Sequence, residues 1–232
     1  MNLGKRDEIL GRIREALRVP APHPHGGANR DDASHLRQTE QTPCEWLPIV
    51  PSDAGDRVNL FREKCAQLRT DFYTVNGTEQ ARMALSVLRE KHGWTVVGAH
   101  HHPLIDPLVQ ALGLETLYVE ERSGSKSLER CSVGITACDA LIAQTGSILL
   151  TARSAGGRAL SVLPPHHVVL ATADQLLPDL PAAFELLLVK YGDNYPSFAT
   201  FITGPSRTGD IERILVLGAH GPRDLTIILV GD

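Results

Sequence analysis

Residues 72–99 have the sequence FYTVNGTEQARMALSVLREKHGWTVVGA. The first four residues form a short extended apolar run, and Thr78 can cap a helix over residues 79–91. Gly93 is placed to end that helix, and the apolar run 94–99 follows it. Strand, helix and strand in this order are typical of a parallel α/β unit, because a right-handed crossover joins two parallel strands.

The same alternation extends in both directions along the chain. Further helices are expected at 56–69, 104–112 and 181–191, and further strands at 116–119, 168–171, 197–202 and 225–230. The sequence therefore predicts an α/β fold with a mainly parallel sheet flanked by helices.

The middle of the chain departs from this rhythm. Two apolar runs, 140–143 and 147–151, are separated only by Gln144, Thr145 and Gly146. A short break that contains glycine favours a hairpin, which we expect to be inserted in the otherwise parallel sheet.

Three parts are expected along the chain. Residues 1–18 contain an amphipathic helix with Ile9, Ile13 and Leu17 on one face, and this helix either docks on the main body or binds a partner. Residues 19–44 are rich in proline and glycine and form a flexible linker. Residues 45–232 form the α/β domain.

Composition excludes several classes of function. The formal net charge of −4 gives no support for nucleic-acid binding, and no apolar run approaches the ~20 residues of a membrane span. The first residues lack the apolar core of a secretory signal, so a cytoplasmic protein is expected. The four cysteines (Cys44, Cys65, Cys131 and Cys138) form no Cys-x-x-Cys pair, which predicts reduced structural thiols and no iron–sulfur cluster.

The loop after the apolar run that ends at Ile202 is a candidate anion site. It contains Gly204, Ser206, Arg207 and Thr208, and a helix turn is expected at 210–213. A loop of small residues at a helix start presents free N–H groups, and an arginine adds a charged, bidentate donor. The alternative is that Ser206 or Thr208 only caps a helix while Arg207 is solvated.

Longer motifs resemble a known family. Residues 134–151, GITACDALIAQTGSILLT, resemble the signature of the LUD domain. The resemblance continues through Arg158 and Ser161, then LPPHH at 163–167, ITGPSRTGDIE at 202–212 and LGAHGPRDL at 217–225. It covers the chain from about residue 45 onward and indicates the lactate-utilization protein C family (YkgG type).

This resemblance implies a fold related to ribose-phosphate isomerase, glucosamine-phosphate deaminase and the CoA-transferases. It also implies a role in oxidising L-lactate to pyruvate together with two iron–sulfur partner proteins. The ferredoxin-like cysteine motifs of the larger relative in that system are missing from this sequence. The resemblance thus implies a small component that carries no cofactor and binds its partner subunits and a small carboxylate or other anion.

Two other functions stay open: a stand-alone isomerase or acyl-transferase-like enzyme, and an assembly scaffold. For an enzyme, His220 and Asp139 are the candidate catalytic residues, His220 because it lies in a glycine-lined loop and Asp139 by analogy of fold alone.

The expected ligand-binding residues come from two loops and one arginine. They are Thr145, Gly146, Ser147, Arg158, Gly204, Ser206, Arg207 and Thr208. If the 145–147 turn and the 206–208 loop lie side by side beyond the carboxyl ends of their strands, they form one concave site. Gly146 also has a purely structural explanation, because a hairpin turn needs glycine.

The histidine runs are expected to hold no metal. His100, His101 and His102 are adjacent, and neighbouring residues of an extended chain point to opposite sides, so three in a row rarely converge on one ion. For the same reason, only one of His166 and His167 is expected to face inward.

Overall fold

The computed structural model describes residues 47–119, 125–208, 216–217 and 221–231. The predicted helix within 1–18, the linker at 19–44, His220 and the helix turn expected at 210–213 lie outside the described residues. None of the helices in the described ranges is both long and apolar enough to cross a bilayer.

The main sheet has six strands, all parallel, and the predicted fold class is confirmed. Their order across the sheet is β1 (Asp71–Asn76), β12 (Asp224–Gly231), β7 (His166–Thr172), β4 (Val133–Thr136), β2 (Val96–Ala99) and β3 (Glu115–Tyr118). The central strands β7 and β12 are buried along almost their whole length. Strands covered on both faces favour continuous apolar sequence, which residues 168–171 of β7 and 227–230 of β12 have.

Helices α3 (Gly77–His92) and α4 (Asp106–Ala111) cover one face of this sheet. Their apolar side chains pack with those of β2, β4, β7 and β12 in one core, which includes Leu85, Leu108, Val97, Ile135, Leu170 and Ile228. Two short 3₁₀ helices, η2 (Ser125–Arg130) and η3 (Ala173–Gln175), lie in connections between strands.

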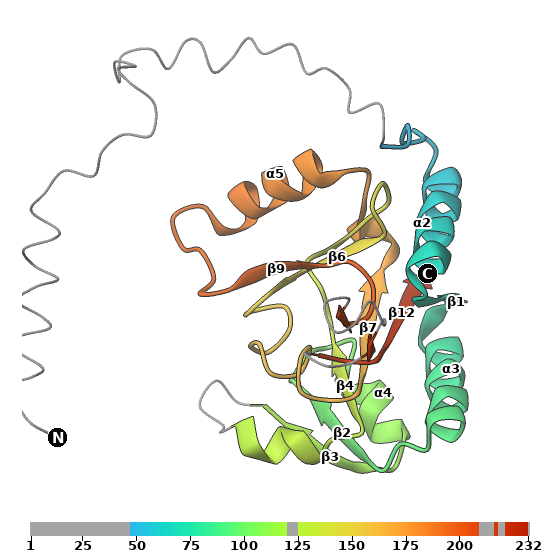
Figure 1. Cartoon of the computed structure of the whole chain (residues 1–232), viewed down its shortest axis with the longest axis vertical. Helices are drawn as coiled ribbons and strands as arrows, with labels where there is room; N and C mark the ends of the chain where they lie inside the picture. The colour runs from blue at the N-terminus through green and yellow to red at the C-terminus, as the bar shows by residue number, and fades with distance from the viewer. Residues whose placement is uncertain (1–46, 120–124, 209–215, 218–220, 232) are drawn as a thin grey trace, which may run out of the picture. The chain divides into compact units, whose positions relative to one another are not determined.

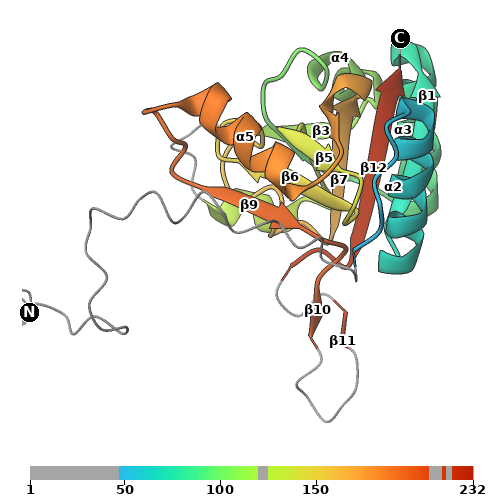
Figure 2. The ribbon, with the colours of Figure 1, turned by 90° about the horizontal axis from the view of Figure 1, so that it is seen from above.

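The opposite face is covered by helix α2 (Ala54–Leu68) and a second, four-stranded sheet. The order in this small sheet is β8 (Leu176–Leu177), β5 (Ala140–Ile142), β6 (Ser147–Thr151) and β9 (Ala199–Ile202). One side of it packs with α2 on the main sheet, through Phe61, Leu141, Ile148, Leu150, Val169 and Ile227. Helix α5 (Leu180–Tyr191) covers its other side, as Figures 1 and 2 show.

The predicted hairpin forms, because β5 and β6 pair antiparallel around the 143–146 turn. Its expected place inside the parallel sheet is wrong, since the hairpin belongs to the separate small sheet. The strand predicted at 197–202 also lies there, as β9, antiparallel to β6. A last pair of short strands, β10 (Arg207–Thr208) and β11 (Val216–Leu217), is antiparallel.

Candidate functional site

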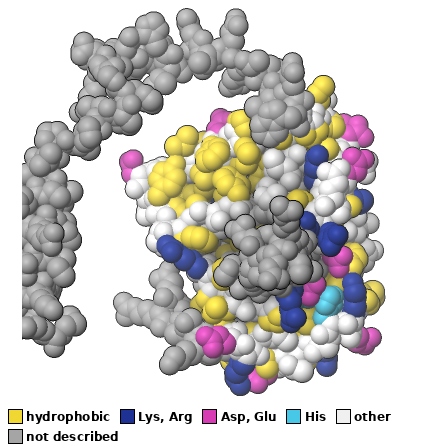
Figure 3. All heavy atoms as spheres, viewed as in Figure 1, with side chains coloured by type: hydrophobic (Ala, Val, Ile, Leu, Met, Phe, Trp, Pro, Cys, Tyr) yellow, Lys and Arg dark blue, Asp and Glu magenta, His cyan; other side chains and the backbone are white. Residues whose placement is uncertain are grey.

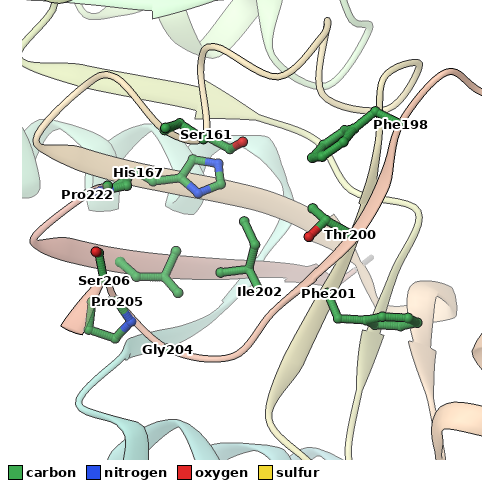
Figure 4. A pocket seen from close by; sticks show the side chains of 13 residues that line it. Ser161, His167, Phe198, Thr200, Phe201, Ile202, Gly204, Pro205, Ser206 and Pro222 are labelled. Atoms are coloured by element: carbon green, nitrogen blue, oxygen red, sulfur yellow. The ribbon is translucent and has the colours of Figure 1, made fainter. Parts of the chain in front are cut away.

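A pocket of about 380 Å³ lies between β9 of the small sheet and the amino-terminal ends of β7 and β12 (Figure 4). Its apolar lining comes mainly from Val162, Phe198, Ile202, Pro205, Pro222 and Leu225. Its polar lining comes from Ser161, His167, Thr200 and Ser206. An apolar cavity with a few convergent polar groups is the usual form of a small-molecule site.

His167 is the titratable side chain among these lining residues. Only 1% of it is exposed, and Nε2 lies 2.9 Å from Oγ1 of Thr136. Burial, with a smaller effect from His166, lowers the pKa of His167 to about 3, so its ring is neutral at pH 7. A neutral imidazole bound at Nε2 offers a ligand one donor or one acceptor at Nδ1, according to its tautomer.

The loop that contains Gly204 and Ser206 forms one wall of the pocket. The backbone N–H of Ser206 donates to the carbonyl of Pro222 over 2.9 Å, which holds this wall against the segment before β12. Two of the predicted ligand-binding residues therefore line the pocket.

Arg158 places a positive charge beside the pocket. Its Nη2 donates to the carbonyl of Ser197 over 2.9 Å, and its guanidinium carbon lies 4.9 Å from the ring centre of Phe198. Because Phe198 lines the pocket, this stacked contact holds the charge of an exposed arginine close to the pocket wall.

The 145–147 turn is hydrogen-bonded to Thr203, the first residue of the loop after β9, whereas the prediction paired it with residues 206–208. Thr145 Oγ1 is 2.7 Å from Ser147 Oγ, which is in turn 2.8 Å from Thr203 Oγ1. The turn follows β5 and the loop follows β9. Because both strands are antiparallel to β6, their carboxyl ends lie at the same end of the small sheet. None of these three hydroxyl-bearing residues lines the pocket.

The 145–147 turn and the loop after β9 pack against the end of α2. Gly146 has φ 68°, and a Cβ there would lie 2.8 Å from Cβ of Lys64, so the hairpin needs glycine at this position. Arg207 donates from Nη2 to the carbonyl of Leu68 at the end of α2. The guanidinium is thereby engaged with the helix, and anion binding by Arg207 stays a prediction. The side chain of Thr208 lies outside the described structure.

Asp139 follows β4 and holds a separate buried cluster together. Its Oδ1 accepts hydrogen bonds from Lys190 Nζ at 2.7 Å and from Tyr191 OH at 2.6 Å. Burial alone would raise the pKa of Asp139, but the donors Lys190, Ser154, Tyr191 and Thr151 outweigh it and lower the pKa. The carboxylate is therefore charged at neutral pH, and its predicted role as a catalytic base is untested.

The three consecutive histidines do not lie together: the ring centres of His100 and His102 are 5.7 Å apart, and His101 packs elsewhere. His100, which follows β2, is buried, and its Nε2 accepts the backbone N–H of Ala137 over 3.3 Å. Burial, followed by the nearby His102, lowers the pKa of His100 to about 4. His101 instead stacks on Tyr118 with ring centres 4.1 Å apart. Across the described ranges, no group of three or more His, Cys, Asp and Glu side chains is arranged to hold a metal ion.

The expectation that only one of His166 and His167 faces inward is wrong, because β7 is covered on both faces. His166 Nε2 lies 2.9 Å from Thr226 Oγ1, and its Nδ1 accepts from Trp94 Nε1 over 3.3 Å. His167 points to the other face and lines the pocket. Alternation correctly places the two side chains on opposite faces, but the local sequence does not show that both faces of β7 are covered.

Residues 58–230 match the sequence profile of the LUD domain. The match covers well over half of the chain, and the chain therefore belongs to the LUD domain family.

The chain is similar over most of its length to several proteins named lactate utilization protein C. The chain is similar to lactate utilization protein C of Halalkalibacterium halodurans, with 29% identity over 237 residues and 98% of each chain covered. It is 27% identical to lactate utilization protein C of Bacillus subtilis over 206 residues, which cover 81% of this chain and 84% of the relative.

A solved structure shares the fold. A crystal structure of a DUF162 family protein from Deinococcus radiodurans superposes with a TM-score of 0.63 at 24% identity. The superposition covers 78% of this chain and 100% of the other, which supports the α/β architecture described above.

Proposed function

We propose that this chain takes part in lactate utilization and that its pocket binds a small organic acid. Support for the process comes from relatives named lactate utilization protein C that match over nearly the whole chain. The observation that carries the ligand class is the pocket itself: an apolar cavity with neutral His167 in its wall and the Arg158 charge beside it.

These groups suit the three parts of a 2-hydroxy or 2-oxo acid. Arg158 attracts the carboxylate, neutral His167 can bond the uncharged oxygen at the second carbon, and Ile202 and Leu225 contact the apolar substituent. The volume of about 380 Å³ lies near the lower end of the range for small-molecule sites, roughly 300–1,000 Å³.

We further propose that the chain acts without a cluster of its own, next to iron–sulfur partner subunits. Burial raises the pKa of Cys65 to about 12 and that of Cys138 well above its usual value. Protonated, buried thiols are poor metal ligands. Iron and sulfide should therefore be found in a complex purified from cells but not in the isolated chain. A brown isolated chain with stoichiometric iron would contradict this assignment.

The ligand proposal is tested by two matched arginine variants. Arg158 and Arg153 are both exposed, and each lies over an aromatic ring, at 4.9 Å from Phe198 and 5.4 Å from Tyr191. Arg158→Gln removes the charge beside the pocket, whereas Arg153→Gln removes an equivalent charge over a ring outside the pocket lining. Loss of a charge-assisted contact costs about 1.5–3 kcal/mol, or ~10- to 150-fold in affinity.

The measurement is calorimetric titration of the full chain with L-lactate and pyruvate, followed by growth on lactate of a deletion strain that carries each variant. We expect Arg158→Gln to weaken binding at least about tenfold and to slow growth, with Arg153→Gln close to wild type. If the wild-type chain binds neither acid, or if the two variants behave alike, the pocket is not the acid site.

A further inference from the structure

A second pocket, of about 390 Å³, lies at the edge of the main sheet, between the end of α2 and strand β1. It is lined by Arg62, Ala66, Arg69, Thr70, Asp71, Phe72 and Tyr73. Figure 2 shows β1 at this edge, next to β12 and beside α2. The pocket shares no lining residue with the proposed acid site.

The backbone of Arg69 is unusual. Its φ is 59°, and no other non-glycine residue in the described ranges has a positive φ. This position follows the last turn of α2, where glycine is favoured because it adopts the left-handed conformation without a steric cost. The ends of α3 and α5 have glycine there, at Gly93 and Gly192. An arginine retained in a disfavoured conformation points to a role for its side chain.

Thr70 presents a hydroxyl that lacks a partner. The residue is 5% exposed, and Oγ1 has no hydrogen-bond partner among the described residues. A buried hydroxyl without a hydrogen-bond partner lowers the stability of the fold unless a ligand or a water molecule bonds to it. Thr70 lines the pocket directly after Arg69, so this hydroxyl belongs to a residue of the pocket wall.

Arg62 supplies a second, pre-positioned charge. Its guanidinium carbon lies 5.3 Å from the ring centre of Phe72, and Nη2 donates to Thr74 Oγ1 over 3.2 Å. A guanidinium has five N–H donors, so this single bond leaves most of them for a ligand. Asp71, the acidic residue of the lining, is paired with Lys91 at 3.3 Å, which offsets its charge.

The end of α2 does not oppose an anion strongly. Its last carbonyls carry partial negative charge, but those of Cys65 and Ala66 accept the backbone N–H groups of Thr70 and Arg69 at 2.8 and 3.1 Å. The carbonyl of Leu68 accepts from Arg207. Within the described part of the chain neither Arg62 nor Arg69 forms an ion pair, so these two arginines dominate the charge of the pocket.

We infer that this pocket is a binding site for an oxyanion, either a phosphate group or a carboxylate, held by Arg62, Arg69 and the Thr70 hydroxyl. Arginine forks match the planar geometry of both groups, and the threonine hydroxyl adds a third donor. The inference is independent of the proposed acid site.

Two substitutions test the site without removing packing. Arg69→Gly should raise the melting temperature in the absence of anions, because glycine tolerates φ 59°, yet weaken anion binding about tenfold or more. Thr70→Val keeps the side-chain shape, should not lower stability because the hydroxyl has no protein partner, and should also weaken binding. Arg82→Ala removes a half-exposed helical arginine outside the pocket and serves as the control.

The probes are inorganic phosphate and acetate, compared with chloride at equal ionic strength, and the readouts are the melting temperature and calorimetric titration of the full chain. Stabilisation by phosphate alone, by acetate alone or by both supports the site and identifies the group that it accepts. The Arg158→Gln variant should respond like wild type, which separates this site from the proposed acid pocket. No specific effect of either anion, or an equal effect on Arg69→Gly and wild type, would overturn the inference.

Discussion

Burial has opposite outcomes for two kinds of titratable side chain in this protein. Asp139 stays charged because Lys190 and Tyr191 donate to its buried carboxylate. His166 and His167 stay neutral because burial lowers their pKa to about 3. Donors to the Asp139 carboxylate thus outweigh the loss of water, whereas at the two histidines the loss of water prevails and the rings stay neutral.

Asp139→Asn should destabilise the protein strongly. The substitution removes the charge that Lys190 and the Tyr191 hydroxyl meet, and breaking a buried ion pair from one side costs about 3–5 kcal/mol. Because the Lys190 side chain is 45% exposed and can turn to water, we expect a smaller loss, about 2–4 kcal/mol. Urea denaturation measures it.

The control is Lys91→Ala, which removes a surface pair with Asp71 and should change stability by less than about 1 kcal/mol. Equal effects of the two substitutions would show that the Asp139 cluster contributes no more than a solvated contact.

Helix α5 has one buried and one exposed apolar face. Leu187 is 6% exposed and packs on the small sheet with Ala183 and Tyr191, whereas its neighbour Leu188 is 63% exposed. Phe184 and Val189 are also exposed, and Figure 3 shows hydrophobic side chains gathered over the region of α5.

Adjacent leucines of α5 should therefore respond differently to the same substitution. Leu187→Ala removes buried methyl groups and should cost about 2–4 kcal/mol of unfolding free energy. Leu188→Ala should change it by no more than about 0.5 kcal/mol. Thermal and urea unfolding of the two variants provide the measurement, and a large loss for Leu188→Ala would mean that its side chain is buried in solution.

The sequence predicted individual elements better than their assembly. The helix expected at 56–69 is α2, at Ala54–Leu68, and the strand expected at 168–171 is the centre of β7. The sequence does not reveal the small sheet, because β5 and β6 are buried on both sides and such strands are as apolar as those of the main sheet. Strand β8 has only two residues and leaves no periodic signal.

For the candidate site too, the sequence indicates individual loop residues but not the contacts between distant segments. Gly204 and Ser206 were identified from loop chemistry and line the pocket. Phe198 and Thr200 were not, because only the pairing of β9 with β6 places that strand beside the pocket. The contact between Arg207 and Leu68 joins residues far apart in the chain, and no local pattern reveals it.

For the whole molecule, three buried histidines predict sensitivity to acid. The pKa of His100 is lowered to about 4, and those of His166 and His167 to about 3. A histidine in the unfolded chain has a pKa near about 6.5. As the pH falls below this value, the unfolded chain binds protons while the folded chain does not. Stability therefore falls with pH until the folded pKa is reached. At pH 5 each histidine should cost about 2 kcal/mol, or about 6 kcal/mol together.

Melting temperatures measured between pH 7.5 and pH 5 should therefore decline steeply. Asp139 does not contribute in this window, because its pKa is lowered and its stabilising effect is lost only at lower pH. His101→Gln removes an exposed histidine and serves as the control for the buried ones. A flat profile would show that the buried histidines titrate without a cost to folding.

Strand β12 lies between β1 and β7, although most of the chain separates it in sequence from β1. During translation, β1 leaves the ribosome with no partner strand to receive it, and it stays unpaired until residues 224–231 follow. Throughout that interval the backbone N–H and C=O groups along the open edges of β1 and β7 are unpaired and can pair with strands of other nascent chains. We therefore expect association between incomplete chains to be strongest immediately before β12 is inserted.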